Sequence, residues 1–143
     1  MIDNKYYLSD KMKQYISRGG TKNFYMKPTI NERIARPLTV AHNKRAGTTN
    51  YLCKEVGENF MLDNENVKNL RIRKLTPKEC WRLMGFDDED FEKAEKVNSD
   101  AQLYKQAGNS IVVNCLEALL KNLFLIVPQK NIKTNVIPKR RLF

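Results

Sequence analysis

The feature that most constrains the fold is a helix start signal at Thr76 followed by a helix stop signal at Gly85. Thr is a good N-cap residue, Pro77 follows at the first helical position, where no backbone donor is needed, and Glu79 completes a capping box. Gly often ends a helix because it adopts the left-handed backbone without steric cost. We therefore predict a short helix that begins after Thr76 and ends at Gly85.

Strand-like patterns lie upstream of this helix. Residues 51–53 and 70–75 alternate apolar and polar side chains, and the polar, Asn-rich residues 63–69 separate them. We expect a hairpin or a pair of edge strands here. Further upstream, residues 9–18 predict a short amphipathic helix, and residues 21–49 favour loops and short strands because they have few periodic apolar positions.

Two more short helices are expected after residue 86. Residues 87–96 carry acidic side chains in the first turn and lysines at the end, which suits the helix dipole, and we interpret this helix as solvent-facing. Residues 100–107 predict a further helical turn, which we expect Gly108 and Asn109 to break.

A long apolar helix is predicted from Ser110 to about residue 127, where Pro128 closes it. We interpret this helix as the hydrophobic anchor of the chain. Residues 128–143 carry several Lys and Arg side chains and few core candidates, so they predict a flexible basic tail.

The tripeptide Gly108-Asn109-Ser110 would open this apolar helix. Gly permits a close backbone approach, the first-turn amides of a helix are free donors, and Asn and Ser add side-chain donors and acceptors. Such an arrangement suits a small anion or a cofactor. The alternative is that Asn109 and Ser110 only cap the helix.

Two runs of residues resemble the last two conserved blocks of the DNA (cytosine-5) methyltransferases, which methylate carbon 5 of a flipped-out cytosine from S-adenosylmethionine. Residues 73–86 read RKLTPKECWRLMGF, and residues 102–114 read QLYKQAGNSIVVN. The similarity covers about residues 5–126 and is strongest over residues 71–124.

The resemblance implies an α/β fold, namely the C-terminal fragment of a Rossmann-like methyltransferase. Residues 1–70 would form the end of the target-recognition region. Residues 71–127 would hold the last two motifs, with part of the small domain and a terminal helix that packs on the catalytic domain. Residues 128–143 would be the basic tail.

The resemblance also implies roles for motif residues. Asn109 and Ser110, with Gly108, would hold the amino-acid portion of S-adenosylmethionine in a pocket shared with the catalytic domain. The earlier motif would mainly build the small domain, with Glu79 or Asp87 as a partner for Arg73. Its structural residues are Arg73, Thr76, Pro77, Glu79, Arg82 and Gly85. Family members commonly have Pro where this chain has Asp87, which should affect the turn more than the chemistry.

Residues 34–40 and 44–51, which read IARPLTV and KRAGTTNY, are similar to the end of the family's target-recognition region. That region approaches the major groove, where base edges carry a unique donor and acceptor code. Pro37 stands where many relatives have Thr. The alternative is a hydrated polar loop without a DNA contact. Our candidate DNA-binding residues are Arg36, Thr39, Lys44, Arg45 and Thr48, with His42 for a minor contact.

The catalytic residues of the family are not matched. The family nucleophile is a Cys in a Pro-Cys dipeptide, whereas Cys53 follows Leu, Cys80 follows Glu and Cys115 follows Asn. We expect Cys80 and Cys115, which fall in predicted helices, to be packing residues. The three cysteines form no CxxC or Cys/His cluster, so neither a disulfide framework nor a metal site is indicated.

The net charge of +10 is uneven along the chain. Residues 1–50 carry 10 Lys and Arg against 3 Asp and Glu, residues 51–100 carry 9 against 12, and residues 101–143 carry 7 against 1. Basic ends favour a polyanion, and double-stranded DNA is the expected partner, although a solvated basic surface has the same charge pattern. No secretion signal or membrane-spanning run is present, so we expect a cytoplasmic protein of a bacterial or phage-infected cell.

Three hypotheses about function follow. The first is the C-terminal portion of a DNA (cytosine-5) methyltransferase, inactive without a catalytic N-terminal half or a separate catalytic subunit, in a restriction-modification setting. The second is a free-standing DNA-binding module or regulator derived from such an enzyme. The third is a decayed gene product without activity, which salt-dependent DNA binding would argue against.

Overall fold

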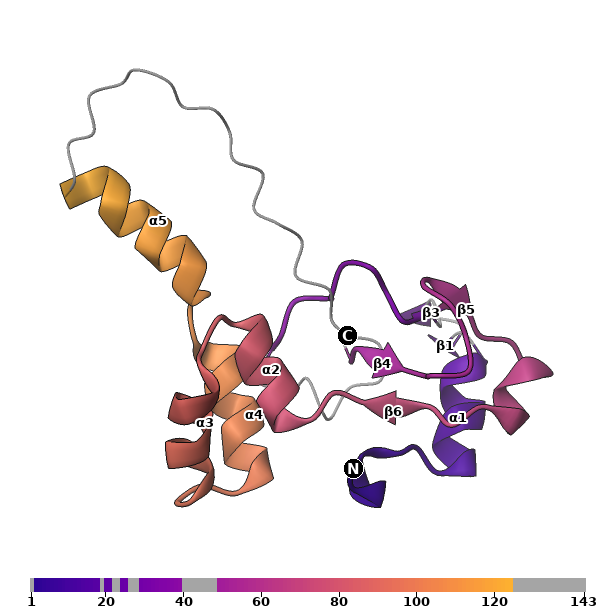
Figure 1. The fold of residues 1–143 in the computed structure, drawn as a ribbon. Helices are drawn as coiled ribbons and strands as arrows, with labels where there is room; N and C mark the ends of the chain where they lie inside the picture. Colours follow the sequence, from indigo (N-terminus) through magenta and orange to yellow (C-terminus); the bar gives the residue numbers. More distant parts are fainter. Residues whose placement is uncertain (1, 19, 22–23, 26–28, 40–48, 125–143) are drawn as a thin grey trace.

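The computed structural model describes residues 2–18, 20–21, 24–25, 29–39 and 49–124 (Figure 1). The described strands lie near α1 (Asp10–Ser17), in one part of the structure. A separate cluster of helices lies beside them and consists of α2 (Pro77–Leu83), α3 (Asp88–Glu95) and α4 (Asp100–Asn109). Helix α5 (Val113–Phe124) extends away from this cluster. The basic tail and the expected end of the apolar helix lie outside the described residues.

The first helix of the sequence analysis is confirmed. A single 3-10 turn, η1 (Asn4–Tyr6), precedes α1 (Asp10–Ser17), and the Ser9 side chain caps α1 by accepting from the Met12 amide at 3.4 Å. On the apolar side of α1 only Ile16 is buried, whereas Met12 is 42% exposed.

The described strands form three antiparallel pairs, and each strand is two residues long. β1 (Gly20–Thr21) pairs with β2 (Phe24–Tyr25), β3 (Thr29–Ile30) with β5 (Phe60–Met61), and β4 (Tyr51–Leu52) with β6 (Arg73–Lys74). The last pair confirms strands at both of the expected places, residues 51–53 and residues 70–75, and the two strands pair with one another. It is not a simple hairpin, because β5 and the 3-10 turn η3 (Asn66–Asn69) intervene.

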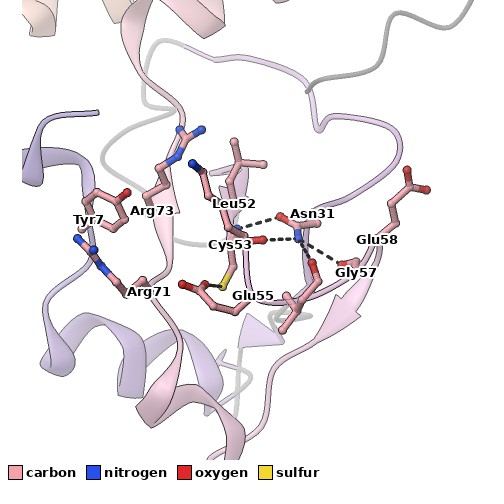
Figure 2. A pocket seen from close by; sticks show the side chains of 11 residues that line it. Tyr7, Asn31, Leu52, Cys53, Glu55, Gly57, Glu58, Arg71 and Arg73 are labelled. Carbon is pink, nitrogen blue, oxygen red and sulfur yellow. Dashed lines mark hydrogen bonds between the residues drawn. The ribbon is translucent and has the colours of Figure 1, made fainter. Parts of the chain in front are cut away.

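Asn31 ties β3 to the loop that follows β4 (Figure 2). Its side-chain Nδ2 donates to the carbonyl oxygens of Cys53 at 2.7 Å and Val56 at 2.8 Å, and its Oδ1 accepts from the Cys53 amide at 2.9 Å. A buried polar side chain is stabilising when its donors and acceptors are all engaged. Asn31 therefore substitutes for the backbone pairing that these two-residue strands lack.

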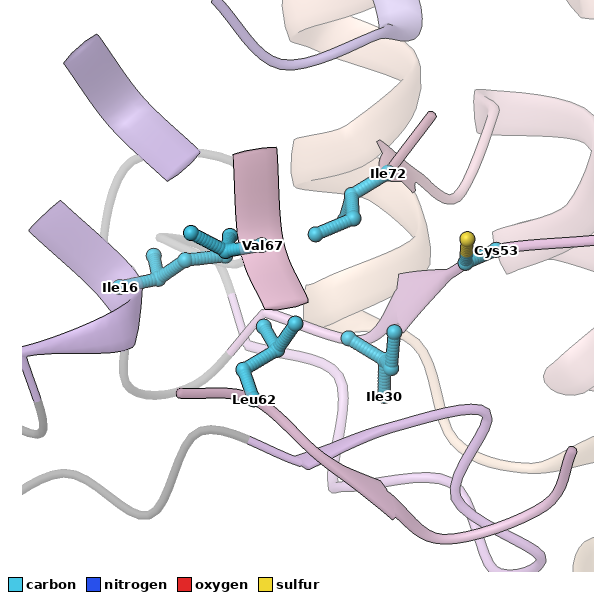
Figure 3. Close-up of a cluster of buried hydrophobic side chains, with 6 residues drawn as sticks. All are labelled: Ile16, Ile30, Cys53, Leu62, Val67 and Ile72. Atoms are coloured by element: carbon cyan, nitrogen blue, oxygen red, sulfur yellow. The ribbon is translucent and has the colours of Figure 1, made fainter. Parts of the chain in front are cut away.

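Two hydrophobic clusters hold the described parts together. The first lies under α1 and the strands and is shown in Figure 3. Its buried members are Ile16, Ile30, Cys53, Leu62, Val67 and Ile72. The second joins β4 to α2 and α4. Its buried members are Leu52, Leu75, Cys80, Met84, Tyr104 and Ala107. Leu52 and Cys53, the last residue of β4 and the residue after it, belong to different clusters, as expected of neighbours in an extended chain whose side chains point to opposite faces.

The helix that begins after Thr76 is confirmed in detail. Thr76 and Glu79 form the capping box, Pro77 is the first helical residue, and Gly85 follows the helix with a φ of 89°. Helix α3 matches the expected span, and most of it faces solvent. It nevertheless buries Phe91, whose ring packs edge-on against Trp81 at 5.6 Å between centroids.

The expectation that Gly108 and Asn109 break the helix is wrong. Helix α4 continues through both residues, and Ser110 closes it by donating from its amide and its hydroxyl to the Ala107 carbonyl at 3.3 and 2.8 Å. Helix α5 begins at Val113, not at Ser110. Packing decides this boundary: Ala107 is 1% exposed, so the last turn of α4 is held against its neighbours despite the glycine.

Helix α5 buries none of its residues. Its exposed apolar side chains are Leu116, Leu119, Leu120, Leu123 and Phe124. Within the chain as described, it is therefore not an anchor. No helix among the described residues has the length and apolar character needed to cross a membrane.

Candidate functional site

A buried ion pair joins β6 to the start of α2. The Arg73 guanidinium donates from Nη1 and Nη2 to the two carboxylate oxygens of Glu79, each at 2.8 Å. The Thr76 amide also donates to Glu79 Oε2 at 2.7 Å. Burial acts to raise the pKa of Glu79, but the hydrogen bonds from Arg73 and Thr76 outweigh it and hold that pKa below its ordinary value. Of the two partners expected for Arg73, the structure pairs it with Glu79.

Arg82, the other cation expected in this motif, lies on the outer side of α2. Its Nε and Nη2 donate to the Asp88 carboxylate at 2.7 and 2.6 Å. Lys78 contacts the same carboxylate at 3.3 Å. These pairs join α2 to α3, and the exposed site limits what they contribute to stability.

The two sequence motifs meet at Gly85. The Val113 amide donates to the Met84 carbonyl at 2.9 Å, and a Cβ placed on Gly85 would lie 3.3 Å from the Val113 Cβ. The positive φ of Gly85 and this close approach both favour glycine. The turn after α2 thus sets where α5 leaves the domain.

The cofactor candidates lie at the C-terminal end of α4. Asn109 is exposed, and Gly108 and Ser110 are half-buried. They do not offer the free first-turn amides expected of a helix start, because the Ser110 amide donates to Ala107. A helix end presents carbonyl oxygens and a partial negative charge, which favours a cationic or N–H group over an anion. The expectation of an anion site made by a helix start is therefore wrong.

One buried acceptor near this end lacks a partner. Gln106 Oε1 is buried and has no hydrogen bond within the described part of the chain. Gln106 precedes Asn109 by three residues, so both side chains lie on neighbouring positions of one helix surface. An unpaired buried acceptor fits a donor such as an ammonium or amide N–H. The Gln106 acceptor therefore suits an ammonium or amide N–H donor at this end of α4.

Of the candidate DNA-binding residues, Arg36 and Thr39 are described. Arg36 is half-buried and forms an ion pair with Glu32, with Nη2 at 2.7 Å from Oε1. Hydrogen bonding to Glu32 raises the pKa of Arg36. Thr39 is exposed. The other candidates, Lys44, Arg45, Thr48 and His42, lie outside the described residues.

Cys53 and Cys80 do not have the environment of a reactive nucleophile. Burial raises the pKa of Cys80 to about 12. Burial and a hydrogen bond to Glu55 raise the pKa of Cys53 to about 11. Cys115 is exposed, so the expectation that it is a packing residue is wrong. It lies on α5, whose surface nothing else in the described chain covers. The described residues contain no cluster that suits a metal ion.

A pocket of about 500 Å³ lies between the loop after β4 and the strand β6 (Figure 2). Arg71 and Tyr7 form one wall, with the guanidinium carbon 4.4 Å from the ring centre. Glu55 and Glu58 line the opposite side. Asn31, which organises this loop with a φ of 52°, is not among the residues that the sequence pattern indicated. The available signal was weak: Asn is the residue type after Gly that best tolerates the left-handed region.

The model of the C-5 cytosine-specific DNA methylase family matches residues 2–125. The chain belongs to this family. The match includes both motifs, the turn at Gly85 where they meet and the strand pairs upstream. The matched residues contain both helices and strands.

Curated relatives of this chain are named methyltransferases. M.Rho11sI, an orphan methyltransferase of Bacillus phage rho11s, is 68% identical over 54 residues, which cover 37% of this chain and 11% of the relative. M2.ScrFI, a type II methyltransferase of Lactococcus lactis subsp. cremoris, is 58% identical over 52 residues, which cover 36% of this chain and 14% of the relative. The matched part of the chain thus spans little more than a tenth of either relative's length.

A solved structure supports the fold of the methylase chain over a longer range. The methyltransferase EhMeth of Entamoeba histolytica aligns with a TM-score of 0.67 and 21% identity, over 87% of this chain and 38% of that chain. At this level of identity the likeness concerns the fold.

Proposed function

We propose that this chain contributes the C-terminal portion of a DNA (cytosine-5) methyltransferase. In this proposal it helps to position double-stranded DNA, completes the S-adenosylmethionine pocket and does not methylate DNA alone. The meeting of the two family motifs at Gly85 and Val113 carries the proposal. Two buried thiols with raised pKa values and a third without the family's Pro-Cys context support the view that the nucleophile comes from another polypeptide segment.

S-adenosylmethionine would supply the methyl group. In this chain Asn109 would bind the amino-acid portion of the cofactor with its exposed amide, and Gln106 Oε1 would accept from the amino group. Gly85 and the Val113 amide would fix the position of these residues relative to α5.

Helix α5 would dock on the catalytic segment. Its exposed apolar residues, Leu119 at 58% and Leu123 at 70% exposure, form a surface that a soluble chain seldom leaves uncovered. Burial of each side chain on docking would contribute about 1.5–3 kcal/mol. The setting we propose is a restriction-modification system in the cytoplasm of a bacterial or phage-infected cell, and the name of the type II methyltransferase M2.ScrFI supports it.

The test is a chimera in which residues 71–124 of this chain replace the corresponding segment of M.Rho11sI. Transfer of tritiated methyl groups from S-adenosylmethionine to DNA is measured. We expect methylation, and Leu119→Lys with Leu123→Lys should abolish most of it. Asn122→Lys, an exposed polar position on α5, is the matched control for charge and should keep it. Asn109→Ala should raise the KM for the cofactor more than it lowers kcat.

Two results would contradict the proposal. A folded chimera that binds DNA but transfers no methyl group would rule out a methyltransferase role for this segment. Full activity in the lysine double variant would rule out docking through α5. The isolated chain should also self-associate or bind a hydrophobic dye, and a compact, dye-silent monomer would argue against an exposed docking helix.

A further inference from the structure

Two asparagines with left-handed backbones frame the segment that follows β3. Asn31 has a φ of 52° and Asn59 a φ of 53°, and the Asn59 amide donates to the Asn31 carbonyl at 2.9 Å. Asn adopts this conformation more readily than other non-glycine residues, and the hydrogen bond between the two asparagines holds both of them in place. This pair therefore forms a rigid frame.

The frame fixes the backbone of residues 32–34 from two sides. The Asn31 amide donates to the Tyr51 carbonyl at 2.9 Å, which holds one end of the segment against β4. The Asn59 side-chain Oδ1 accepts from the Arg33 amide at 3.2 Å, which holds its centre against β5. The backbone of this segment is consequently held in place, while the exposed side chains of Arg33 and Ile34 do not contribute to the core.

The side chains presented there are apolar and cationic. Ile34 is 80% exposed and Met61, on the neighbouring strand β5, is 56% exposed. Both line a surface hollow of about 420 Å³ together with the exposed Arg33. We refer to Arg33, Ile34 and Met61 as the Ile34 patch.

The charges around the Ile34 patch favour an anionic partner. Arg33 has no ion pair within the described residues, so its guanidinium is available. The nearest carboxylate in the lining, Glu32, is engaged by Arg36 at 2.7 Å and is thereby neutralised. The first 50 residues carry 10 Lys and Arg against 3 Asp and Glu, so the field of this part of the chain is positive.

A rigid apolar contact beside an available cation matches one feature of the DNA major groove. The 5-methyl group of a pyrimidine is the apolar group that base edges present there, and phosphates flank it. We propose that Ile34 and Met61 contact a pyrimidine 5-methyl group while Arg33 contacts a neighbouring phosphate. This inference rests on the proposed function, in which the chain positions double-stranded DNA. It makes the Ile34 patch a determinant of target specificity.

The test uses the full chain and a pool of duplexes with a randomised core. After the preferred site is selected, each thymine is replaced in turn by deoxyuridine, which lacks the methyl group, and each cytosine by 5-methylcytosine, which gains it. We expect one deoxyuridine replacement to weaken binding about fourfold, or one 5-methylcytosine replacement to strengthen it about fourfold. The first result identifies thymine as the source of the methyl group, and the second identifies methylated cytosine.

Ile34→Ser should remove this discrimination while the chain stays folded, because the side chain is exposed and the asparagine frame remains. Val97→Ser is the matched control, since Val97 is 82% exposed and lies after α3, away from the Ile34 patch in the sequence. Arg33→Gln should weaken binding to all duplexes alike and lower the salt dependence by about one counterion.

Several outcomes overturn the inference. They include a wild-type affinity that no replacement changes, an Ile34→Ser variant that discriminates like the wild type, and binding without sequence preference. In each of these cases the proposed function stands, because the chain still binds DNA. If the chain binds no duplex at low salt, the proposed function fails as well. Loss of self-association in Ile34→Ser with DNA binding unchanged would assign the patch to a second copy of the chain instead.

Discussion

The backbone amide of Val113 donates a hydrogen bond to the carbonyl oxygen of Met84 at 2.9 Å, so the first residue of α5 is fixed to the last turn of α2. This bond joins the two sequence motifs of the methylase. Gly85 lies between them, and a Cβ at this position would approach Val113 to 3.3 Å.

Gly85→Ala should therefore destabilise the chain by about 1–2 kcal/mol, because the φ of 89° and the close approach both oppose a side chain. Chemical denaturation followed by circular dichroism measures the change. Gly57→Ala is the control, since nothing lies within 4 Å of a Cβ placed there. Equal effects of the two substitutions would contradict the role of the turn.

Glu79→Gln should cost about 1–3 kcal/mol of unfolding free energy, because it leaves the guanidinium of Arg73 buried without a counter-charge. Glu89→Gln removes an exposed pair with Lys93 and should change stability by less than about 0.5 kcal/mol. Each variant removes one negative charge from a helix. Similar losses of unfolding free energy would therefore show that burial of the Arg73–Glu79 pair does not matter for stability.

Acid should destabilise the folded chain partly through Glu79. Its pKa in the folded state lies below the ordinary value of 4.5, so its contribution is complete above about pH 4.5 and is lost as the pH falls through the folded pKa. We expect the unfolding midpoint of the wild type to fall more steeply below pH 4.5 than that of Glu79→Gln. Parallel pH profiles would contradict this assignment.

The three thiols should differ in reactivity toward iodoacetamide. Cys115 is exposed and should react first under native conditions, whereas Cys53 and Cys80 are buried and their raised pKa values disfavour the thiolate. Mass spectrometry should find one fast modification, which Cys115→Ser removes. Fast labelling of Cys80 in the folded chain would show that the α2–α4 packing opens readily.

Local signals in the sequence predicted the starts of α1 and α2 well. Ser9 and Thr76 form the expected caps, and the capping box of Thr76 and Glu79 is complete. Such contacts involve residues at most a few positions apart, so the pattern of residue types contains the information. The presence of strands within residues 51–53 and 70–75 was also predicted, although the segment between them contributes β5, which pairs with β3.

Long-range packing decided what the sequence pattern misjudged. From Gly108, the sequence pattern predicted that α4 ends before it does. Burial of Ala107 against α2 outweighs the tendency of Gly108 to end a helix. Nothing local distinguished Cys80, which is buried, from Cys115, which is exposed, since both fall in helices with apolar neighbours.

The sequence by itself determined the family motifs, the helix caps and the uneven charge, because these depend on residue type and short spacing. Only the tertiary structure decided that the motifs meet at Gly85 and that the apolar side chains of α5 are exposed to solvent. It also decided that Asn31 and Asn59 hold the backbone that carries the Ile34 patch. These features depend on contacts between residues far apart in the chain. Their energies arise from burial and geometry that no local pattern encodes.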